Sequence, residues 1–411
     1  MTKTDRPRTP WWLYPTFALL AFVAWRVLTL GLADHWAESD PARALWWRGD
    51  HPEALIRLAE REVTDPARAA DAERHAKAAL RASPLDGRPY RILAQLADAA
   101  GDKPRAAELY MLAIKHSPRD IPSQAWLADW HLAHGEVALA LDRVDLMLRV
   151  RPALLKQIVP MLAVLASAPQ AQAPFAAVLA KDPPWRASAL VQIARAAESA
   201  DGIAPLFDLL RREPEGLADT ELAAWVDRLV ADGQWGRAYL TWISALPPER
   251  RERIGNVFNG GFEAAPLTHG FDWRFGRVPG ARIDRLPVNG AGGRVALRVA
   301  FDDRRIPFAH VRQMLALPPG TYRFEGRAKP AGLRTERGLV WTLTCIPKPG
   351  TALAETDPLK GQGDWRDFGV DFTVPDGCGA QWLTLRTPWR IAAEQRLGGQ
   401  AWFDDLRITR Q

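Results

Sequence analysis

The stretch NVFNGGFEAAPLTHGFDWRF, residues 256–275, marks a change in the character of the chain. It contains three glycines, two asparagines, four phenylalanines and one tryptophan, and its apolar residues have no helical spacing. The residues before it are rich in alanine, leucine and arginine, which favour helices. The stretch therefore predicts that a helical region ends near residue 255 and that a domain of another class begins at 256.

The region after this boundary reads as a series of short strands. Apolar and polar residues alternate within each run, as they do in strands that bury one face, and Gly- and Pro-rich turns separate the runs. Many short alternating strands at this spacing predict an antiparallel β-sandwich over residues 256–411. The main runs are GRVALRVAF, GTYRFEGRAKP, GLVWTLTCI, WRDFGVDFTVP, AQWLTLRTP and AWFDDLRITR.

The order of phrases in this region resembles that of jelly-roll carbohydrate-binding and galactose-binding-like domains. NGGFE (259–263) opens the region, WFDDLRI (402–408) closes it, and LPPGTYRFEGRAK and GDWRDFGVDFTVP lie between them. The resemblance implies a jelly-roll sandwich with a surface that contacts glycan.

The resemblance also implies a structural calcium ion. In such domains the Glu of the opening phrase and an Asp of the closing strand meet at the ion, and here these residues are Glu263 and Asp404. Calcium takes several oxygen ligands, so backbone carbonyls and water would complete the set. Alternatively, the two carboxylates cap turns or pair with arginine.

Tryptophan rings are the candidate glycan contacts, because a flat ring stacks on the apolar CH face of a sugar. The chain holds 18 tryptophans. Four of them lie at strand ends or in loops of the predicted sandwich: Trp273, Trp365, Trp382 and Trp389. The alternative for each is a place in the apolar core.

The two cysteines of the chain, Cys345 and Cys378, both lie in the predicted sandwich. An even pair within one domain outside the cytoplasm predicts a disulfide. Two free, buried thiols are the alternative.

The helical region has an internal period. Pro84, Pro118 and Pro152 are 34 residues apart, and Gly101 and Gly135 keep the same spacing. This period is typical of a helix-turn-helix solenoid and resembles the tetratricopeptide repeat. We therefore predict a helical solenoid over 34–255, clearest at 86–152, that docks a protein partner. The alternative is a spacer that holds the sandwich away from a membrane.

The N-terminus predicts a membrane anchor. Basic residues in a tail at 1–10 precede an apolar run at 11–33, which is long enough to span a bilayer. The positive-inside rule places the tail in the cytoplasm and the remainder in the periplasm of a cell with an inner membrane. Arg26 interrupts the run and either snorkels to the interface or contacts a partner membrane protein. A cleaved signal peptide is the alternative.

Composition and motifs narrow the function class. The net charge is +6, but arginines are scattered without a basic block, which predicts no nucleic-acid binding. The sequence holds no G-x-S-x-G, P-loop or H-E-x-x-H motif, and we expect no catalysis. The architecture predicts a non-enzymatic accessory protein of envelope or extracellular polysaccharide assembly. A pure protein–protein scaffold and a glycan-acting enzyme are the alternatives.

Overall fold

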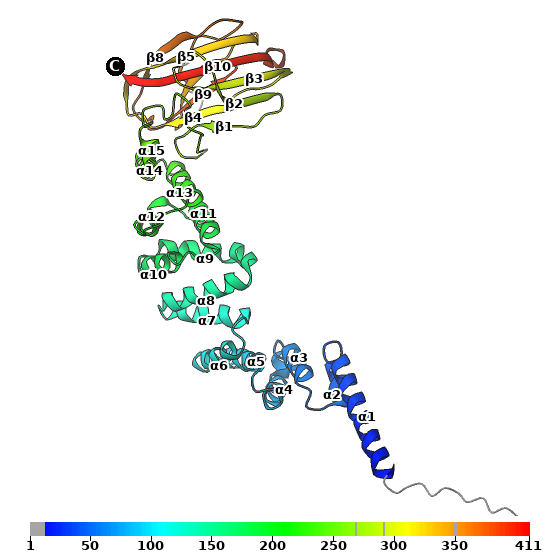
Figure 1. The fold of residues 1–411 in the computed structure, drawn as a ribbon. Coiled ribbons are helices and arrows are strands. Elements are labelled where there is room, and N and C mark those ends of the chain that lie inside the picture. Colours follow the sequence, from blue (N-terminus) through cyan, green and yellow to red (C-terminus); the bar gives the residue numbers. More distant parts are fainter. Residues whose placement is uncertain (1–12, 268, 291, 348–351) are drawn as a thin grey trace, which may run out of the picture. The chain divides into compact units, whose positions relative to one another are not determined.

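The computed structural model describes residues 13–267, 269–290, 292–347 and 352–411 (Figure 1). The predicted cytoplasmic tail and the first two residues of the predicted anchor, Trp11 and Trp12, lie outside the described residues. The chain divides into two compact units. One comprises residues 1–161 and 168–186, and the other comprises residues 162–167 and 187–411.

Helix α1 (Leu13–Trp36) opens the first unit. Its large apolar side chains from Phe17 to Leu28 are 49–67% exposed, and Arg26 lies among them. Towards its end Thr29 and Ala33 are buried, and the helix continues three residues beyond the predicted end at 33. Within the described residues α1 alone is long and apolar enough to cross a membrane, as a signal sequence also would be, unless the bent pair α9–α10 counts as one span.

The helices that follow pack as successive hairpins (Figure 1). Helices α6 and α8 begin 34 residues apart, at Lys103 and Val137, as the period predicts. Gly101 and Gly135 follow α5 and α7 at φ values of 84° and 76°, a left-handed conformation that glycine adopts without strain. The helices of this array are α2 (Pro41–Trp47), α3 (Pro52–Glu62), α4 (Ala69–Ala82), α5 (Arg88–Ala99), α6 (Lys103–His116), α7 (Ile121–Ala133), α8 (Val137–Val150), α9 (Leu155–Ser167) and α10 (Pro169–Leu179).

The second unit begins with helices of less regular spacing. The rings of Phe207 on α12 and Trp225 on α13 stack with centroids 4.6 Å apart, and both side chains are fully buried. Trp242 on α14 packs against Phe258 and Phe271 of the segment that leads into the sandwich. These helices are α11 (Arg186–Ala196), α12 (Ala200–Leu210), α13 (Asp219–Ala231), α14 (Trp235–Ser244) and α15 (Pro248–Arg251).

Two five-stranded antiparallel sheets form the predicted sandwich (Figure 1). The first sheet has the order β1 (Arg274–Phe275), β4 (Val311–Leu315), β9 (Gln381–Arg386), β6 (Val340–Cys345) and β7 (Ala352–Glu355). The second sheet has the order β2 (Ala281–Pro287), β3 (Val295–Arg305), β10 (Arg396–Arg410), β5 (Gly320–Arg334) and β8 (Arg366–Val374). The order of the strands in each sheet differs from their order along the chain. The last strand, β10, lies between β3 and β5 in the second sheet.

The core lies between the two sheets and follows from the alternation in the sequence. Leu297 and Val299 of β3 are fully buried, as are Leu383 and Leu385 of β9. Aromatic rings of both sheets meet at Trp341, whose ring lies 5.5 Å from that of Phe403. The prediction of an antiparallel sandwich is therefore confirmed.

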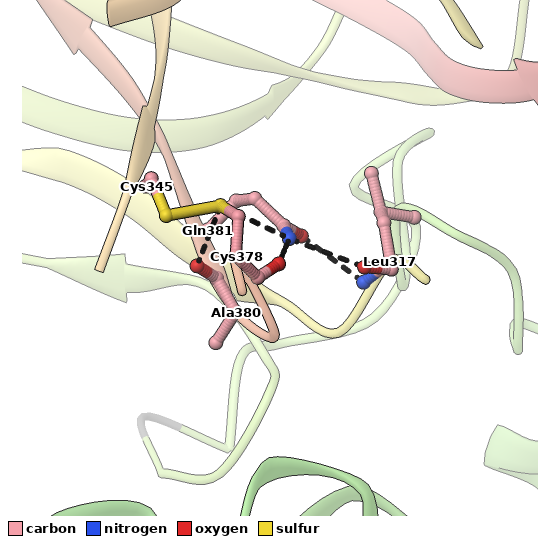
Figure 2. Close-up of a disulfide and its surroundings, with 5 residues drawn as sticks. All are labelled: Leu317, Cys345, Cys378, Ala380 and Gln381. Carbon is pink, nitrogen blue, oxygen red and sulfur yellow. Dashed lines mark hydrogen bonds between the residues drawn. A yellow bond between two sulfur atoms is a disulfide. The ribbon is translucent and has the colours of Figure 1, made fainter. Parts of the chain in front are cut away.

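The predicted disulfide is also confirmed (Figure 2). Cys345 at the end of β6 is bonded to Cys378 in the loop before β9, and both residues are buried. Gln381 fixes the surrounding loops, because its amide nitrogen donates to the carbonyls of Cys378 and Leu317 and its oxygen accepts from the Leu317 amide. The pairing excludes the alternative of two free thiols.

Candidate functional site

The opening phrase NGGFE fastens the start of the sandwich to its last strand. Asn259 has a φ of 50°, and its side chain exchanges two hydrogen bonds with the backbone of Ala264. Gly260 accepts from the Leu406 amide, and a Cβ at this glycine would lie 1.9 Å from the Leu406 oxygen. The phrase is therefore a structural clasp in which a glycine is required for close backbone approach.

Glu263 and Asp404, the predicted calcium ligands, both bind the end of the turn between β2 and β3. Glu263 Oε1 accepts from the amides of Arg294 and Val295 at 2.6 and 3.0 Å. Asp404 Oδ2 accepts from Gly292 and Gly293 at 2.9 and 3.2 Å. The side chains thus come from the two ends of the domain and meet at one turn.

Asp404 is a fully buried carboxylate. Its Oδ1 is buried without a well-formed hydrogen bond. Burial raises the pKa of Asp404 above its usual value of 3.8, and backbone amides, including those of Asp405 and Gly293, offset part of this effect. Both carboxylates cap this turn, which is the alternative to calcium binding, and Asp404 Oδ1 is left without a well-formed hydrogen bond.

Trp273, one of the predicted glycan contacts, has no exposed surface. Its ring packs against Phe262 and Trp341, and its indole N–H donates to the Asn259 carbonyl at 3.1 Å. The prediction was wrong for this residue, because the clasp folds over the indole and the residue becomes part of the core.

Trp382 lies on the solvent side of the first sheet. Burial alternates along β9, so that Trp382, Thr384 and Arg386 are partly exposed while the residues between them are buried. The guanidinium of Arg312 on β4 lies 4.5 Å from the centre of the Trp382 ring, and that of Arg274 on β1 lies 5.2 Å away. The Trp382 ring therefore makes cation–π contacts with two arginines of the neighbouring strands.

Trp389 lies three residues beyond the end of β9 and is 45% exposed, the most accessible of the four candidate rings. Ile391 beside it is 61% exposed. We refer to Trp382, Thr384, Arg386 and Trp389 as the β9 strip. It carries an aromatic ring near each end and polar groups between them, a combination that suits a sugar chain.

The outer face of the second sheet carries Trp365 and Trp402. Trp365 donates to the Asn289 carbonyl at 3.3 Å and lies near the guanidinium of Arg327. Sequence reasoning missed Trp402, although the alternation in WFDD turns Phe403 inward and hence Trp402 outward. The charges of this face are paired, for example Arg298 with Asp284 at 2.6 Å.

A hollow of about 280 Å³ on the same face is lined by charged residues that bind one another. Arg407 lies 2.8 Å from Glu325, and Arg327 lies 3.6 Å from Asp367. The described residues hold no group of three or more His, Cys, Asp or Glu side chains with metal-binding geometry.

No protein-family model and no curated protein matches the chain. Solved structures similar to part of it include a CBM4 carbohydrate-binding module, with 18% identity over 38% of this chain and 99% of that chain and a TM-score of 0.29. A family 61 module in complex with β-1,4-galactotriose has 17% identity over 38% and 99% of the two chains and a TM-score of 0.26. A xylan-binding domain from Paenibacillus barcinonensis has 14% identity over 37% and 91% and a TM-score of 0.26. The sandwich itself is established by the strand pairing of this chain.

Proposed function

We propose that the chain is a membrane-attached, non-enzymatic accessory protein of cell-envelope or extracellular polysaccharide assembly. In this proposal the sandwich contacts glycan, and the helical array, a tetratricopeptide-like solenoid, docks a protein of the inner membrane or periplasm. The apolar, exposed surface of α1 supports anchoring, and the basic residues ahead of it support a cytoplasmic N-terminus. The disulfide supports a periplasmic place for the sandwich, because disulfides persist in oxidising compartments.

The observation that carries the glycan proposal is the β9 strip. Thr384 and Arg386 offer hydroxyl and guanidinium donors on β9, and Trp389 offers an exposed ring in the segment that follows the strand. A strand rises about 3.3 Å per residue, so the part of the strip on β9, from Trp382 to Arg386, extends for about 13 Å, and the chain turns before Trp389. That length suits several sugars of a polymer better than a single monosaccharide.

The helical array offers a face for a protein partner. The rings of Tyr110, Trp126, Trp130 and His134 follow one another along α6 and α7 with centroids 4.0–5.5 Å apart. Trp126 and Trp130 remain partly exposed. Aromatic residues of this kind are enriched at protein interfaces. We further propose that Arg26, within the exposed apolar part of α1, contacts a partner membrane protein.

The glycan proposal predicts a selective effect of two tryptophans. Full-length chain in detergent would be titrated by calorimetry with envelope and exopolysaccharide fragments. Truncation of an aromatic anchor costs about 2 kcal/mol or more, so we expect Trp389→Ala to lower affinity about thirtyfold. Trp402→Ala on the opposite face is the matched control and should bind as the parent chain does.

Unchanged binding by Trp389→Ala and Trp382→Ala would place the glycan elsewhere. If no fragment binds and the chain instead captures a defined polysaccharide synthase, the alternative of a pure protein scaffold replaces the proposal. The aromatic face of α6 and α7 is the observation that favours that alternative.

We also propose a structural calcium ion at Glu263 and Asp404. The residues fit such an ion, because Asp404 Oδ1 is buried without a well-formed hydrogen bond and both carboxylates lie at one turn. The ion would supply the positive charge that this buried carboxylate lacks. Its role would be to hold the opening and closing segments of the sandwich together.

A further inference from the structure

The outer face of the first sheet places positive charges side by side. Arg274 on β1 and Arg312 on β4 are direct partners in the strand register. Like charges directly opposite each other on neighbouring strands destabilise a sheet. Arg386 adds a third guanidinium on the same face.

These arginines have little compensation from acidic side chains. Arg274 lies 3.8 Å from Asp227, and Arg386 lies 3.9 Å from Glu355, both longer than a hydrogen bond. Among the residues that the structure describes, no carboxylate oxygen comes within 4.0 Å of the Arg312 guanidinium, which is exposed. The face therefore keeps an excess of positive charge.

The second sheet of the same sandwich shows the opposite arrangement. Arg298 lies 2.6 Å from Asp284, Arg323 lies 2.9 Å from Asp371, and Arg407 lies 2.8 Å from Glu325. Arginines of this domain can therefore be paired closely with carboxylates, as these three are. Arg274, Arg312 and Arg386 differ from these pairs, because no carboxylate oxygen among the described residues lies closer than 3.8 Å to any of them.

Trp382 holds the uncompensated arginines in position. A guanidinium that lies over an aromatic ring keeps its in-plane N–H donors free for another group. Arg312 is exposed, so its N–H donors are accessible, whereas the Nε of Arg274 is buried and its terminal nitrogen donates to the Gly270 carbonyl at 3.2 Å. The exposed guanidinium of Arg312, held beside the Trp382 ring, is therefore a receptor for a planar carboxylate, because it can donate two parallel hydrogen bonds.

The ionisation of the neighbouring groups reflects this charge. Burial lowers the pKa of Arg274, and the charge of Arg312 adds to the effect against the opposing contribution of Asp227. Burial and then Arg312 also lower the pKa of His310. A bound anion would remove the repulsion that these groups experience.

We propose that the β9 strip, with Arg274 and Arg312, binds a polysaccharide that carries carboxylate groups on its sugar rings. The inference rests on the proposed glycan-binding function and names the class of glycan. Arg312 binds a carboxylate and Trp382 positions its guanidinium. Arg274 and Arg386 add positive charge to the face, and Trp389 contacts a sugar ring farther along the polymer.

The test compares polymers that differ only in charge. Full-length chain in detergent is applied to immobilised polygalacturonate and to the same polymer with its carboxylates methyl-esterified. We expect stronger binding to the acid form. Arg312→Gln should lower the affinity for the acid form about tenfold, or about 1.4 kcal/mol, and leave the esterified form unaffected.

Two further variants keep the result interpretable. Arg312→Lys retains the charge but loses the planar fork, so we expect an intermediate affinity. Arg323→Gln removes an exposed arginine from the second sheet and should bind as the parent chain does. An unchanged melting curve for each variant shows that the sandwich is folded.

The outcomes separate this inference from the proposed function. Equal binding to both polymers, or preference for the ester, overturns the carboxylate inference and leaves glycan binding standing. Equally tight binding of single-stranded DNA or dextran sulfate overturns it in favour of general polyanion binding. No binding to polygalacturonate, alginate or hyaluronate overturns it, and failure with neutral polymers as well removes the glycan proposal.

Discussion

Single residues decide how the sandwich closes. Asn259 and Phe262 hold φ values of 50° and 53°, in a region that non-glycine residues rarely occupy. The surrounding contacts compensate for this strain, because the Asn259 side chain is satisfied by Ala264 and Phe262 is fully buried. The clasp therefore depends on the identity of Asn259, Gly260 and Phe262.

Asp404 adds a cost to this closure when it is ionised. Because its pKa in the folded protein is raised above 3.8, ionisation opposes folding. This destabilisation is fully present at pH values above the pKa of Asp404 in the folded protein. It is lost as the pH falls through that pKa and the carboxylate becomes protonated. In the absence of a cation, the contribution of Asp404 to the free energy of unfolding thus increases towards acid pH.

This reasoning predicts linked effects of pH and calcium. In chelator-treated protein, stability relative to Asp404→Asn should rise as the pH is lowered from about 7 towards about 4. At neutral pH, calcium should raise the melting temperature of the parent chain and not that of Asp404→Asn. Calorimetric melting of both proteins measures the two effects, and an identical response to calcium would rule out a site at Asp404.

At the scale of elements, small residues set the packing of the helical hairpins. Ala106 on α6 is fully buried, and Ala140 occupies the equivalent place on α8 with 1% exposure. An alanine at such a position lets neighbouring helices approach closely, which larger side chains would prevent. The 34-residue spacing of these alanines is why the hairpins can be recognised in the sequence.

Overpacking one of these contacts should be costly. We expect Ala106→Trp to destabilise the chain by about 1–3 kcal/mol or more, since a buried helix contact has no space for an indole. Lys115→Trp on the exposed side of the same helix is the control and should have little effect. Equal denaturant midpoints for the two variants would contradict the packing assignment.

The elements were more predictable than the site. Period and alternation are repeated many times along the chain, so the helical hairpins and the sandwich could be read from them. Trp273 was misassigned because it lies in a loop, where alternation does not determine which way a side chain points. The arginines beside Trp382 come from strands distant in sequence, and only the strand register brings Arg274 opposite Arg312.

On the scale of the whole molecule, an apolar helix is continuous with a folded unit. The final turns of α1 are part of that unit, since Ala33 is buried and Asp34 lies 2.7 Å from the ring nitrogen of His51. A helix that must remain packed in this way is poorly suited to removal by a protease. The burial of Thr29 and Ala33, which cleavage before Asp34 would remove, is an argument for the proposed uncleaved anchor.

Topology can be tested with reporter fusions. We expect alkaline phosphatase fused after residue 40 to be active and to remain in the membrane pellet, because basic residues before an apolar helix favour a cytoplasmic N-terminus. A cytoplasmic reporter at the same position should be inactive and serves as the control. A soluble, active fusion with a new N-terminus near Asp34 would show cleavage instead.

The last strand of the sandwich imposes an order on its biosynthesis. Strand β10 lies between β3 and β5, and its residues Leu406 and Ile408 bind the opening segment. Until that strand has emerged, β3 and β5 present unpaired backbone edges of the kind that promotes aggregation. A nonsense codon ahead of β10 should therefore prevent the whole domain from folding, and nascent chains should need protection until β10 has been translated.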